Sequence, residues 1–358
     1  PAPASRVPPP ERNTGRARER TAPSFAEHAM APAAPVVGSA NSTEIRVGAV
    51  LRDRFQLTER VAGGRMGEVY RAVDRLKREA GYPDPSVAIK VLGPDLRNSP
   101  EALHLLQQEA LKAQRLSHPG IVNVFDLDRT EGHYFITMEW LNGESLAALL
   151  DRARPRPMPL PEVRRILSGV GEALTYAHRQ GMVHGDIKPG NIFLGQGGRV
   201  KLLDFGLARM PDPGHQLESD GPFAMTRAYA SCEMLEGRDP LVQDDVYALA
   251  CVVYRMVAGH RPFGQRTALE AEREGLRPRR PKGLGAGAWR ALRAGLAYRR
   301  KARPQTVEAF VSQFLGDESG RGHRGWIAAL MVGGVLALAG FVLSEYSEDL
   351  QRLTGNLP

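Results

Sequence analysis

Cysteine is scarce in this chain: its 358 residues contain only Cys232 and Cys251. Two thiols cannot form a disulfide framework or supply the four ligands of a thiolate zinc site. So few cysteines are typical of a protein in a reducing compartment. The first 48 residues also lack the apolar run of a cleavable secretory signal. The sequence therefore excludes a disulfide-stapled fold and offers no cleavable signal peptide.

The overall composition is that of a globular protein, with 42% hydrophobic and 25% charged residues. These values exclude a wholly disordered chain, a collagen and a membrane protein with many spans. The net charge of +8 suits acidic partners or a membrane surface, but the charge alone does not identify the partner. Because the chain begins with Pro1 and not Met, we expect the natural N-terminus to lie upstream.

Composition divides the chain into five parts. Residues 1–48 are rich in Pro, Ala and Arg and have no hydrophobic period, so we expect a disordered arm. Its arginines suit either a solvated linker or contact with anionic lipid or an acidic partner. Residues 49–316 carry the pattern of a globular domain. The remaining parts are a basic linker, an apolar segment and a short external tail, at 317–325, 326–343 and 344–358.

The apolar segment 326–343 contains no charged side chain. As a helix it would be about 27 Å long, close to the ~30 Å hydrocarbon core of a bilayer. A buried core helix is the alternative, but no neighbouring core would cover it. Basic residues precede the segment and acidic ones follow, which predicts a single-pass protein of the cell membrane with its large N-terminal part in the cytoplasm. Ala329, Gly333 and Ala337 suit either a plain anchor or a helix that pairs in a homodimer.

Within the globular part, strand patterns come before helical ones. Short runs predict strands at 55–61, 67–73, 86–92, 122–128 and 134–140. One helix, predicted at 101–116, interrupts them, and later helices are predicted at 162–179 and 244–258. A sheet-rich part followed by a helix-rich part indicates an α+β fold with two lobes.

Two motifs lie in the strand-rich part. VAGGRMGEVY at 61–70 is a glycine-rich turn between two strand patterns. Glycines there allow the backbone to approach phosphates, although glycine-rich hairpins are common for other reasons. VAIK, at 87–90, ends a buried-looking strand with Lys90. A lysine at that place is costly unless it meets an anion or reaches the surface.

Two further motifs follow in the helix-rich part. HGDIKPGN at 184–191 places Asp186 and Asn191 five residues apart in a loop, and LDFG places Asp204 directly after a strand pattern. In this order and spacing, the four motifs resemble the Hanks-type (eukaryotic-like) bacterial serine/threonine protein kinases with a C-terminal single membrane span. The resemblance covers about residues 50–315. It implies a bilobal protein-kinase-like fold, with a sheet-rich N-lobe and a helical C-lobe, plus one transmembrane helix.

The resemblance also implies catalytic roles. Asp186 matches the base that orients the substrate hydroxyl, and Lys188 matches the lysine that neutralises the transferring phosphoryl group. Lys90 matches the lysine that contacts the α- and β-phosphates, with Glu109 as its expected partner. Without Lys90, Glu109 would suit an ordinary solvated helix face. The Lys188-Pro189 pair is similar to the serine/threonine type.

The implied cofactors are ATP and Mg²⁺, with Mn²⁺ as the alternative metal. Asn191 and Asp204 match the metal ligands, and both supply hard oxygen donors. Ala62 replaces the first glycine of the phosphate-covering loop, a small intrusion expected to alter nucleotide affinity only slightly. The implied ATP-binding residues are Val61, Ala62, Gly63, Gly64, Gly67, Val69, Ala88, Lys90, Met138, Glu139 and Leu141.

Further matches concern the substrate loop and the helical lobe. Thr226 matches the threonine of the substrate-binding loop, and Asp245 matches the buried aspartate that holds the catalytic loop. Glu233 and Arg303 match an ion pair that closes the C-lobe, a structural role. Many kinases carry an arginine where this chain has Gly185, and that arginine receives an activation-loop phosphate. Activation by loop phosphorylation is therefore not expected.

The segment between Asp204 and Glu233 offers three Ser and Thr hydroxyl groups as phosphorylation sites, those of Ser219, Thr226 and Ser231. The same segment carries the carboxylates of Asp212, Glu218 and Asp220, which would repel a phosphate. A basic stretch follows at 277–303, with ten Lys and Arg residues and no Asp or Glu. It suits a solvated face of the C-lobe or contact with anionic headgroups. Nucleic-acid binding is not expected, because the charges show no regular interleaving with aromatic residues, and only Trp289 and Tyr298 lie among them.

The sequence thus predicts a membrane-anchored, ATP-dependent serine/threonine protein kinase that acts on Ser and Thr hydroxyls of protein substrates. A pseudokinase signalling scaffold is the first alternative, but pseudokinases usually lack at least one member of the catalytic set that is complete here. A small-molecule phosphotransferase of related fold is the second. It would need neither Thr226 nor the closing pair of Glu233.

Overall fold

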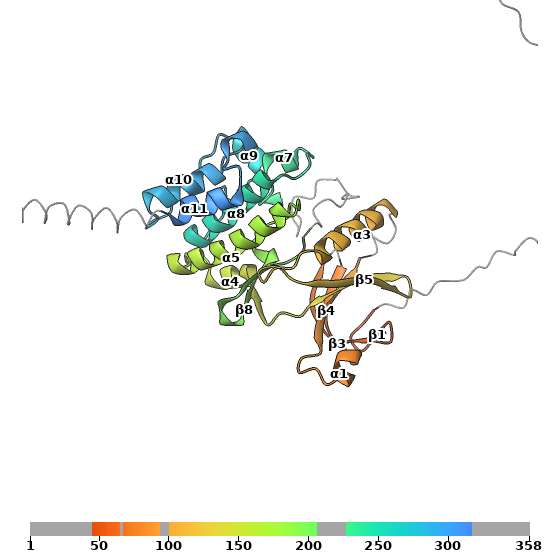
Figure 1. The fold of residues 1–358 in the computed structure, drawn as a ribbon. Coiled ribbons are helices and arrows are strands. Elements are labelled where there is room, and N and C mark those ends of the chain that lie inside the picture. Colours follow the sequence, from red (N-terminus) through yellow and green to blue (C-terminus); the bar gives the residue numbers. More distant parts are fainter. Residues whose placement is uncertain (1–44, 65–66, 94–99, 206–226, 317–358) are drawn as a thin grey trace, which may run out of the picture. The chain divides into compact units, whose positions relative to one another are not determined.

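The structure is a computed structural model that describes four stretches of the chain (Figure 1). They are residues 45–64, 67–93, 100–205 and 227–316. Most of the predicted arm, and all of the predicted linker, membrane span and tail, lie outside them. Within these stretches, no helix combines the length and the apolar character that crossing a bilayer requires.

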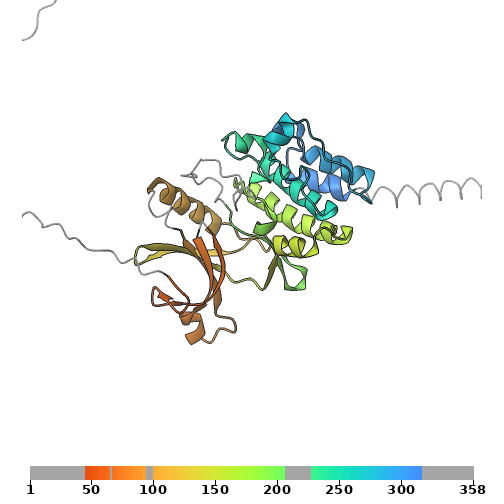
Figure 2. The ribbon, with the colours of Figure 1, turned by 180° about the vertical axis from the view of Figure 1, so that it is seen from behind.

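The first part of the domain is a six-stranded antiparallel sheet with strand order β1-β2-β3-β4-β6-β5. The sheet curls (Figure 2) around a small core that includes Phe55, Ile89 and Phe135. The strands are β1 (Val50–Leu51), β2 (Phe55–Gly64), β3 (Gly67–Asp74), β4 (Ser86–Leu92), β5 (Val124–Thr130) and β6 (His133–Glu139).

Two helices accompany the sheet. α3 (Pro100–Gln114) packs against β5 and buries Ala110 and Ala113. α1 (Arg75–Glu79) follows β3, and the carboxylate of Asp74 accepts two backbone N–H groups of its first turn. α1 was not predicted from the sequence, because its five residues are too few to show a helical period. The capping aspartate was its one signal.

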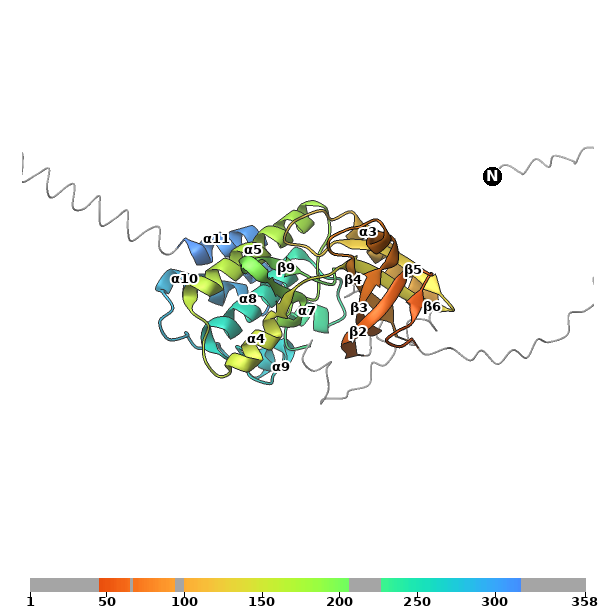
Figure 3. The ribbon, with the colours of Figure 1, turned by 90° about the horizontal axis from the view of Figure 1, so that it is seen from below.

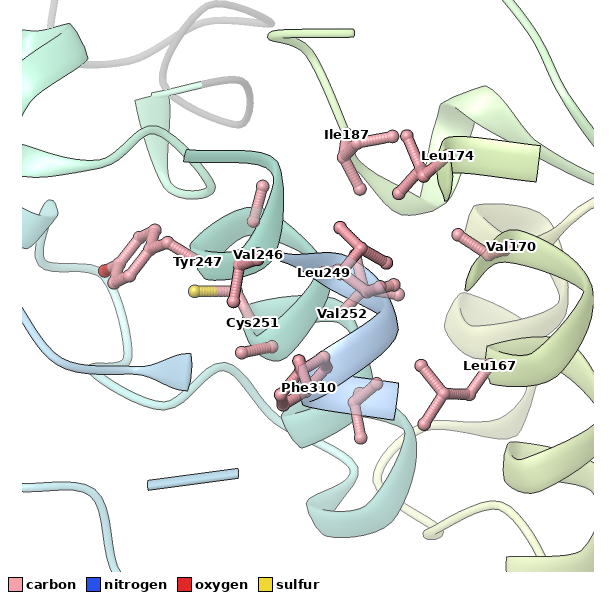
Figure 4. Packing of buried hydrophobic residues seen from close by; sticks show 14 of the residues in the cluster. Leu167, Val170, Leu174, Ile187, Val246, Tyr247, Leu249, Cys251, Val252 and Phe310 are labelled. Atoms are coloured by element: carbon pink, nitrogen blue, oxygen red, sulfur yellow. The ribbon is translucent and has the colours of Figure 1, made fainter. Parts of the chain in front are cut away.

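The second part of the domain is helical and holds the main core. α8 (Val242–Ala258) is buried along nearly its whole length, as expected for a helix that is apolar on most sides. Its Leu249 and Val252 point toward Leu167 and Val170 of a neighbouring helix (Figure 4). Burying each such side chain stabilises the fold by roughly 1.5–3 kcal/mol.

Around α8 lie the other helices and a small sheet of order β7-β8-β9. Figure 3 shows α10 and α11 side by side. The helices are α4 (Leu146–Ala153), α5 (Leu160–Arg179), α7 (Cys232–Leu235), α9 (Ala268–Arg273), α10 (Ala286–Gly295) and α11 (Val307–Leu315). The strands are β7 (Gly143–Ser145), β8 (Ile192–Gly195) and β9 (Val200–Leu202).

α8 ends at Gly259, whose φ is +76°. A Cβ atom at this residue would stand 2.1 Å from the carbonyl oxygen of Pro155. Glycine is the one residue that both adopts this conformation without strain and allows so close an approach. The C-terminal end of α8 is thereby fixed against the segment between α4 and α5.

The predicted α+β fold with two lobes is confirmed. The strand predicted at 86–92 matches β4, and the one predicted at 67–73 ends one residue short of the end of β3. The helix predicted at 244–258 begins two residues earlier, at Val242. The difference arises because Asp244 accepts the N–H of Leu241 and so caps the helix instead of starting it.

Candidate active site

The loop at 184–191 is held in place by one buried carboxylate, that of Asp245 in the first turn of α8. Its Oδ2 accepts the backbone N–H of His184 at 2.9 Å, and its Oδ1 accepts that of Gly185 at 2.8 Å. The ring of His178 on α5 lies 2.7 Å from Oδ2. The loop is therefore held by its backbone, so the side chains that follow are not needed to fix it in place.

Gly185 has a φ of +74°. An L-residue in this left-handed region is strained by about 1–2 kcal/mol, so glycine suits the turn that brings its N–H to Asp245. From the sequence, Gly185 was notable only because it replaces a phosphate-binding arginine. The structure shows in addition that the backbone conformation at this position favours glycine.

Asp186 is the centre of a hydrogen-bonded cluster in this loop. Its Oδ2 lies 2.7 Å from Nζ of Lys188 and accepts a hydrogen bond from Nδ2 of Asn191 at 3.0 Å. The same amide nitrogen donates to the backbone oxygen of Asp186 at 2.8 Å. No hydrogen bond to Oδ1 of Asp186 is found within the described part of the chain. That oxygen can accept a hydroxyl proton from an incoming group.

Lys90 and Asp204 meet across the site. Nζ of Lys90, which is 8% exposed on β4, lies 3.0 Å from Oδ1 of Asp204. Burial alone would raise the pKa of Asp204, but the charge and hydrogen bond of Lys90, together with the nearby His184 and Lys188, outweigh burial and hold that pKa below its usual range. The buried charge of Lys90 is thus compensated by the carboxylate of Asp204, one of the two outcomes expected for a lysine at this place. Glu109, its predicted partner, lies on α3, and its side chain is outside the described residues.

The donor set of the loop fits a magnesium ion. Asn191 uses its amide nitrogen to hold Asp186, so its Oδ1 is the atom that would bind a metal, and Asp204 would add a carboxylate. Magnesium prefers few protein oxygens, completed by water and phosphate oxygens. No group of three or more His, Cys, Asp or Glu side chains with metal-binding spacing is found among the described residues, so a site made of protein ligands alone is not indicated there.

The strand residues of the predicted nucleotide site are neighbours in the sheet. Val69 pairs with Lys90, and Ala88 pairs with Met138. Met138, which is half-buried as expected, also lines a small apolar cavity that reaches Asp204 and α3. Gly67 has a φ of +129°, and a Cβ atom there would stand 1.9 Å from the carbonyl oxygen of Val91.

The remaining members of the predicted ATP-binding set lie where the motif suggests. Val61, Ala62, Gly63 and Gly64 form the last residues of β2. In the hairpin Ala62 pairs with Val69, Gly63 with Glu68 and Gly64 with Gly67. Leu141 follows β6 in the predicted hinge and is half-buried.

The hinge carries an ion pair that the sequence analysis missed. Oε2 of Glu139 lies 2.9 Å from Nζ of Lys201 on β9 and accepts the N–H of Asn123 at 3.2 Å. Nζ of Lys201 also donates to the oxygen of Ile121 at 3.1 Å. The side chain of Glu139 therefore joins β6 to β9, and a contact of Glu139 with adenine would come from its backbone. The guanidinium of Arg71 stacks over the ring of Trp140, 5.0 Å from its centroid.

Thr226, the predicted residue of the substrate-binding loop, lies outside the described residues, and the structure describes the chain again from residue 227. Tyr229 accepts a hydrogen bond from Nη1 of Arg255 at 3.0 Å. Nη2 of the same guanidinium donates to Oδ1 of Asp151 on α4 at 2.5 Å. Arg255 is buried on α8, so it joins the chain after the predicted substrate loop to α4. No local motif pointed to this link.

Glu233 and Arg303 form the expected ion pair, with 2.8 Å between Oε2 and Nη2. Arg303 also contacts Asp244 at 3.0 Å, and Arg300 binds the same carboxylate. Burial would raise the pKa of Asp244, but hydrogen bonds, foremost that from Arg300, outweigh it and lower that pKa.

Ser231 also belongs to this network, since its hydroxyl donates to Oδ1 of Asp244 at 2.7 Å and is fully buried. The interpretation of Ser231 as a phosphorylation site is therefore wrong for this conformation. Ser219, the other predicted site beside Thr226, lies outside the described residues.

Residues 55–313 match the family model of the protein kinase domain. The chain belongs to the protein kinase family. It is 37% identical over 230 residues to the serine/threonine-protein kinase PknA of Mycobacterium tuberculosis, which covers 63% of this chain and 51% of that protein. It is 34% identical over 219 residues to PknB of Mycolicibacterium smegmatis, covering 60% of this chain and 34% of that protein. The chain thus spans about half or less of the length of these curated kinases.

Solved kinases share the fold. The crystal structure of the PknI kinase domain of Mycobacterium tuberculosis superposes with a TM-score of 0.61 at 26% identity. The alignment covers 76% of this chain and all of that one. The family match confirms the prediction of a protein kinase domain, and the curated relatives named here are bacterial serine/threonine-protein kinases. No departure among the described catalytic residues favours a pseudokinase.

Proposed function

We propose that this chain is an ATP-dependent kinase that transfers the γ-phosphoryl group of ATP to Ser and Thr hydroxyls of protein substrates. One observation carries the proposal: Lys188 and Asn191 hold Oδ2 of Asp186, and no hydrogen bond to Oδ1 comes from the residues that the structure describes. A carboxylate fixed in this way can orient a hydroxyl for attack on a phosphorus atom. The names of the serine/threonine kinases that this chain resembles support the same substrate class.

The chemical step needs little covalent work from the protein. The substrate oxygen forms a bond to the γ-phosphorus while the bond to the bridging oxygen of ADP breaks, and Asp186 accepts the hydroxyl proton. Lys188 places a positive charge near the transferring phosphoryl group, where negative charge spreads in the transition state. When bound, Mg²⁺ neutralises phosphate charge, and Asn191 and Asp204 would hold it. Lys90 would contact the α- and β-phosphates.

We further propose that residues 326–343 anchor the kinase domain at the cytoplasmic face of the cell membrane. The support is the sequence: an uncharged segment of spanning length with basic residues before it and acidic residues after it. The small residues Ala329, Gly333 and Ala337 would allow two such helices to pair, which suggests a homodimer. The anchor is tested by fractionation of cells that express the full chain or a version without 326–343. The full chain should resist extraction by carbonate, and recovery of both chains in the soluble fraction would contradict the anchor.

The test of the activity is transfer of radiolabelled phosphate from ATP to a generic basic protein acceptor, with the full chain and Mg²⁺. We expect Asp186→Asn to lower turnover by about 10²–10⁴-fold, the usual contribution of a positioned general base. Glu308→Gln, which alters an exposed ion pair on α11, serves as the matched control and should leave turnover unchanged. Nucleotide binding without any transfer by the parent would establish the scaffold instead.

A further inference from the structure

The basic stretch at 277–303 does not form one uniform surface. Three of its ten cations bind carboxylates of the helical part: Arg299, Arg300 and Arg303. Arg303 is buried and Arg300 is half-buried, so the expectation of a solvated face is wrong for these two, whereas Arg299 is paired but exposed. The structure thereby separates cations that are paired with carboxylates from those that can meet a partner.

The other seven cations are exposed, and none of them forms an ion pair with the described part of the chain. Because the stretch contains no Asp or Glu, its sequence supplies no local neutralisation. We name these seven side chains the basic surface: Arg277, Arg279, Arg280, Lys282, Arg290, Arg293 and Lys301.

The loop that carries four of these cations is held in one shape. The hydroxyl of Tyr254 donates to the backbone oxygen of Arg279 at 2.9 Å, and the hydroxyl of Tyr298 donates to that of Leu276. Nε of Arg280 donates to the oxygen of Leu284 at 2.9 Å. A loop that is ordered before binding loses less conformational entropy when a partner arrives.

α10 continues the basic surface. Arg290 and Arg293 are three residues apart and so share one helix face, while Ala288, Ala291 and Leu292 are buried on the other. This helix packs on α11, the last described helix (Figure 3). The cations therefore lie on the helix next to the point where the chain leaves the domain.

We infer that the basic surface lies against anionic lipid headgroups at the cytoplasmic face of the membrane. The inference rests on the proposed anchor at 326–343. Residues 317–325 reach at most about 30 Å when fully extended, so the end of α11 would stay close to the bilayer. Nη1 of Arg164 donates to the oxygen of Leu315 at 3.2 Å and fixes that end on α5. Seven unneutralised cations near a negative surface complement its charge.

This arrangement would set the orientation of the kinase domain. A flexible anchor alone leaves the domain free to rotate, whereas a second, electrostatic contact presents one side to the lipid. The contact should weaken with salt, because screening shortens the range of charge interactions to about 8–10 Å at 0.1–0.15 M ionic strength.

The test compares the full chain in vesicles of phosphatidylcholine with the full chain in vesicles that also contain phosphatidylglycerol. Hydrogen–deuterium exchange is followed in peptides that cover residues 276–302. We expect exchange there to slow by about tenfold in the anionic vesicles only, equivalent to one or two well-placed cations, and to recover at high salt. The double variant Arg290→Glu/Arg293→Glu should lose most of the protection.

A matched control reverses two cations at the same spacing on α1, Arg75→Glu/Arg78→Glu, and should keep the protection. Equal exchange in both lipids, or equal loss in the control, would overturn the inference. So would protection by duplex DNA without any by phosphatidylglycerol. A chain that fails to co-sediment with either vesicle would instead contradict the anchor, and phosphate transfer assayed in the same samples reports separately on the kinase function.

Discussion

Nζ of Lys90 lies 3.0 Å from Oδ1 of Asp204. One residue comes from strand β4 of the sheet, and the other follows β9 in the helical part. Their pairing brings a buried positive charge and the carboxylate that is predicted to bind the metal to the same point. The nucleotide phosphates and their metal would then meet both parts of the domain at once.

Replacing Lys90 by Met should abolish phosphate transfer and leave the fold intact. Methionine fills a similar volume and brings no charge that must be buried. The pKa of Asp204 should rise in this variant, because the charge of Lys90 is the main influence that lowers it. Steady-state turnover measures the loss, and circular dichroism checks the fold. Turnover within about tenfold of the parent would contradict the assignment of Lys90 to the phosphates.

Gly185→Ala should destabilise the domain by about 1 kcal/mol, because alanine is strained at a φ of +74°. Gly190→Ala in the same loop is the control, since a Cβ there would meet open space and its φ is not positive. Urea denaturation of both variants measures the difference. Equal stability of the two would show that the conformation of Gly185 carries no cost for other residues.

The parent should not depend on activation-loop phosphorylation, since Gly185 offers no side chain to receive the phosphate. Phosphatase treatment followed by an assay of initial rates is the measurement. The variant Gly185→Arg should not by itself become dependent on phosphorylation, because Asp212, Glu218 and Asp220 of the same segment repel a phosphate. Loss of most activity from the treated parent would overturn this view of the loop.

Asp244→Asn should cost roughly 3–5 kcal/mol at neutral pH, because it leaves Arg300 and the buried Arg303 with one carboxylate fewer. The folded pKa of Asp244 is lowered, so its contribution is fully present above the unfolded value of about 3.9 and disappears as the pH falls through the folded value. The difference in unfolding free energy between parent and variant should therefore stay constant from pH 7 to about pH 5 and narrow as the pH falls below about 4. A constant gap at all pH values would contradict the ionised pairing.

Arg255→Met should raise the KM for the protein acceptor and leave the KM for ATP unchanged. The variant removes the hydrogen bond to Tyr229, which lies just after the predicted substrate loop, and the ion pair to Asp151. A lost bond to a buried partner costs about 1–3 kcal/mol. Tyr229→Phe removes only the hydroxyl and should show part of the effect. Equal changes in both KM values would indicate a general loss of structure.

The sequence predicted what short motifs encode. It indicated the strands around Lys90, the loop around Asp186 and the carboxylate of Asp245, because each is marked by neighbours a few positions away. It missed the links of Glu139 with Lys201 and of Arg255 with Asp151. These partners are separated by 62 and 104 positions, and either cation alone suits an ordinary surface or helix position. Such pairs become visible only when packing brings distant segments together.

The close approach of Gly259 to Pro155 has a consequence for the active site. α8 carries Asp245 at one end and Arg255 near the other, so one rigid rod supports both the catalytic loop and the chain beyond the substrate loop. A side chain at position 259 would clash with the oxygen of Pro155, and a shift of α8 that relieved the clash would displace both supports together. A substitution remote from the phosphates would then resemble a catalytic lesion in its kinetics, although no reacting group had been altered.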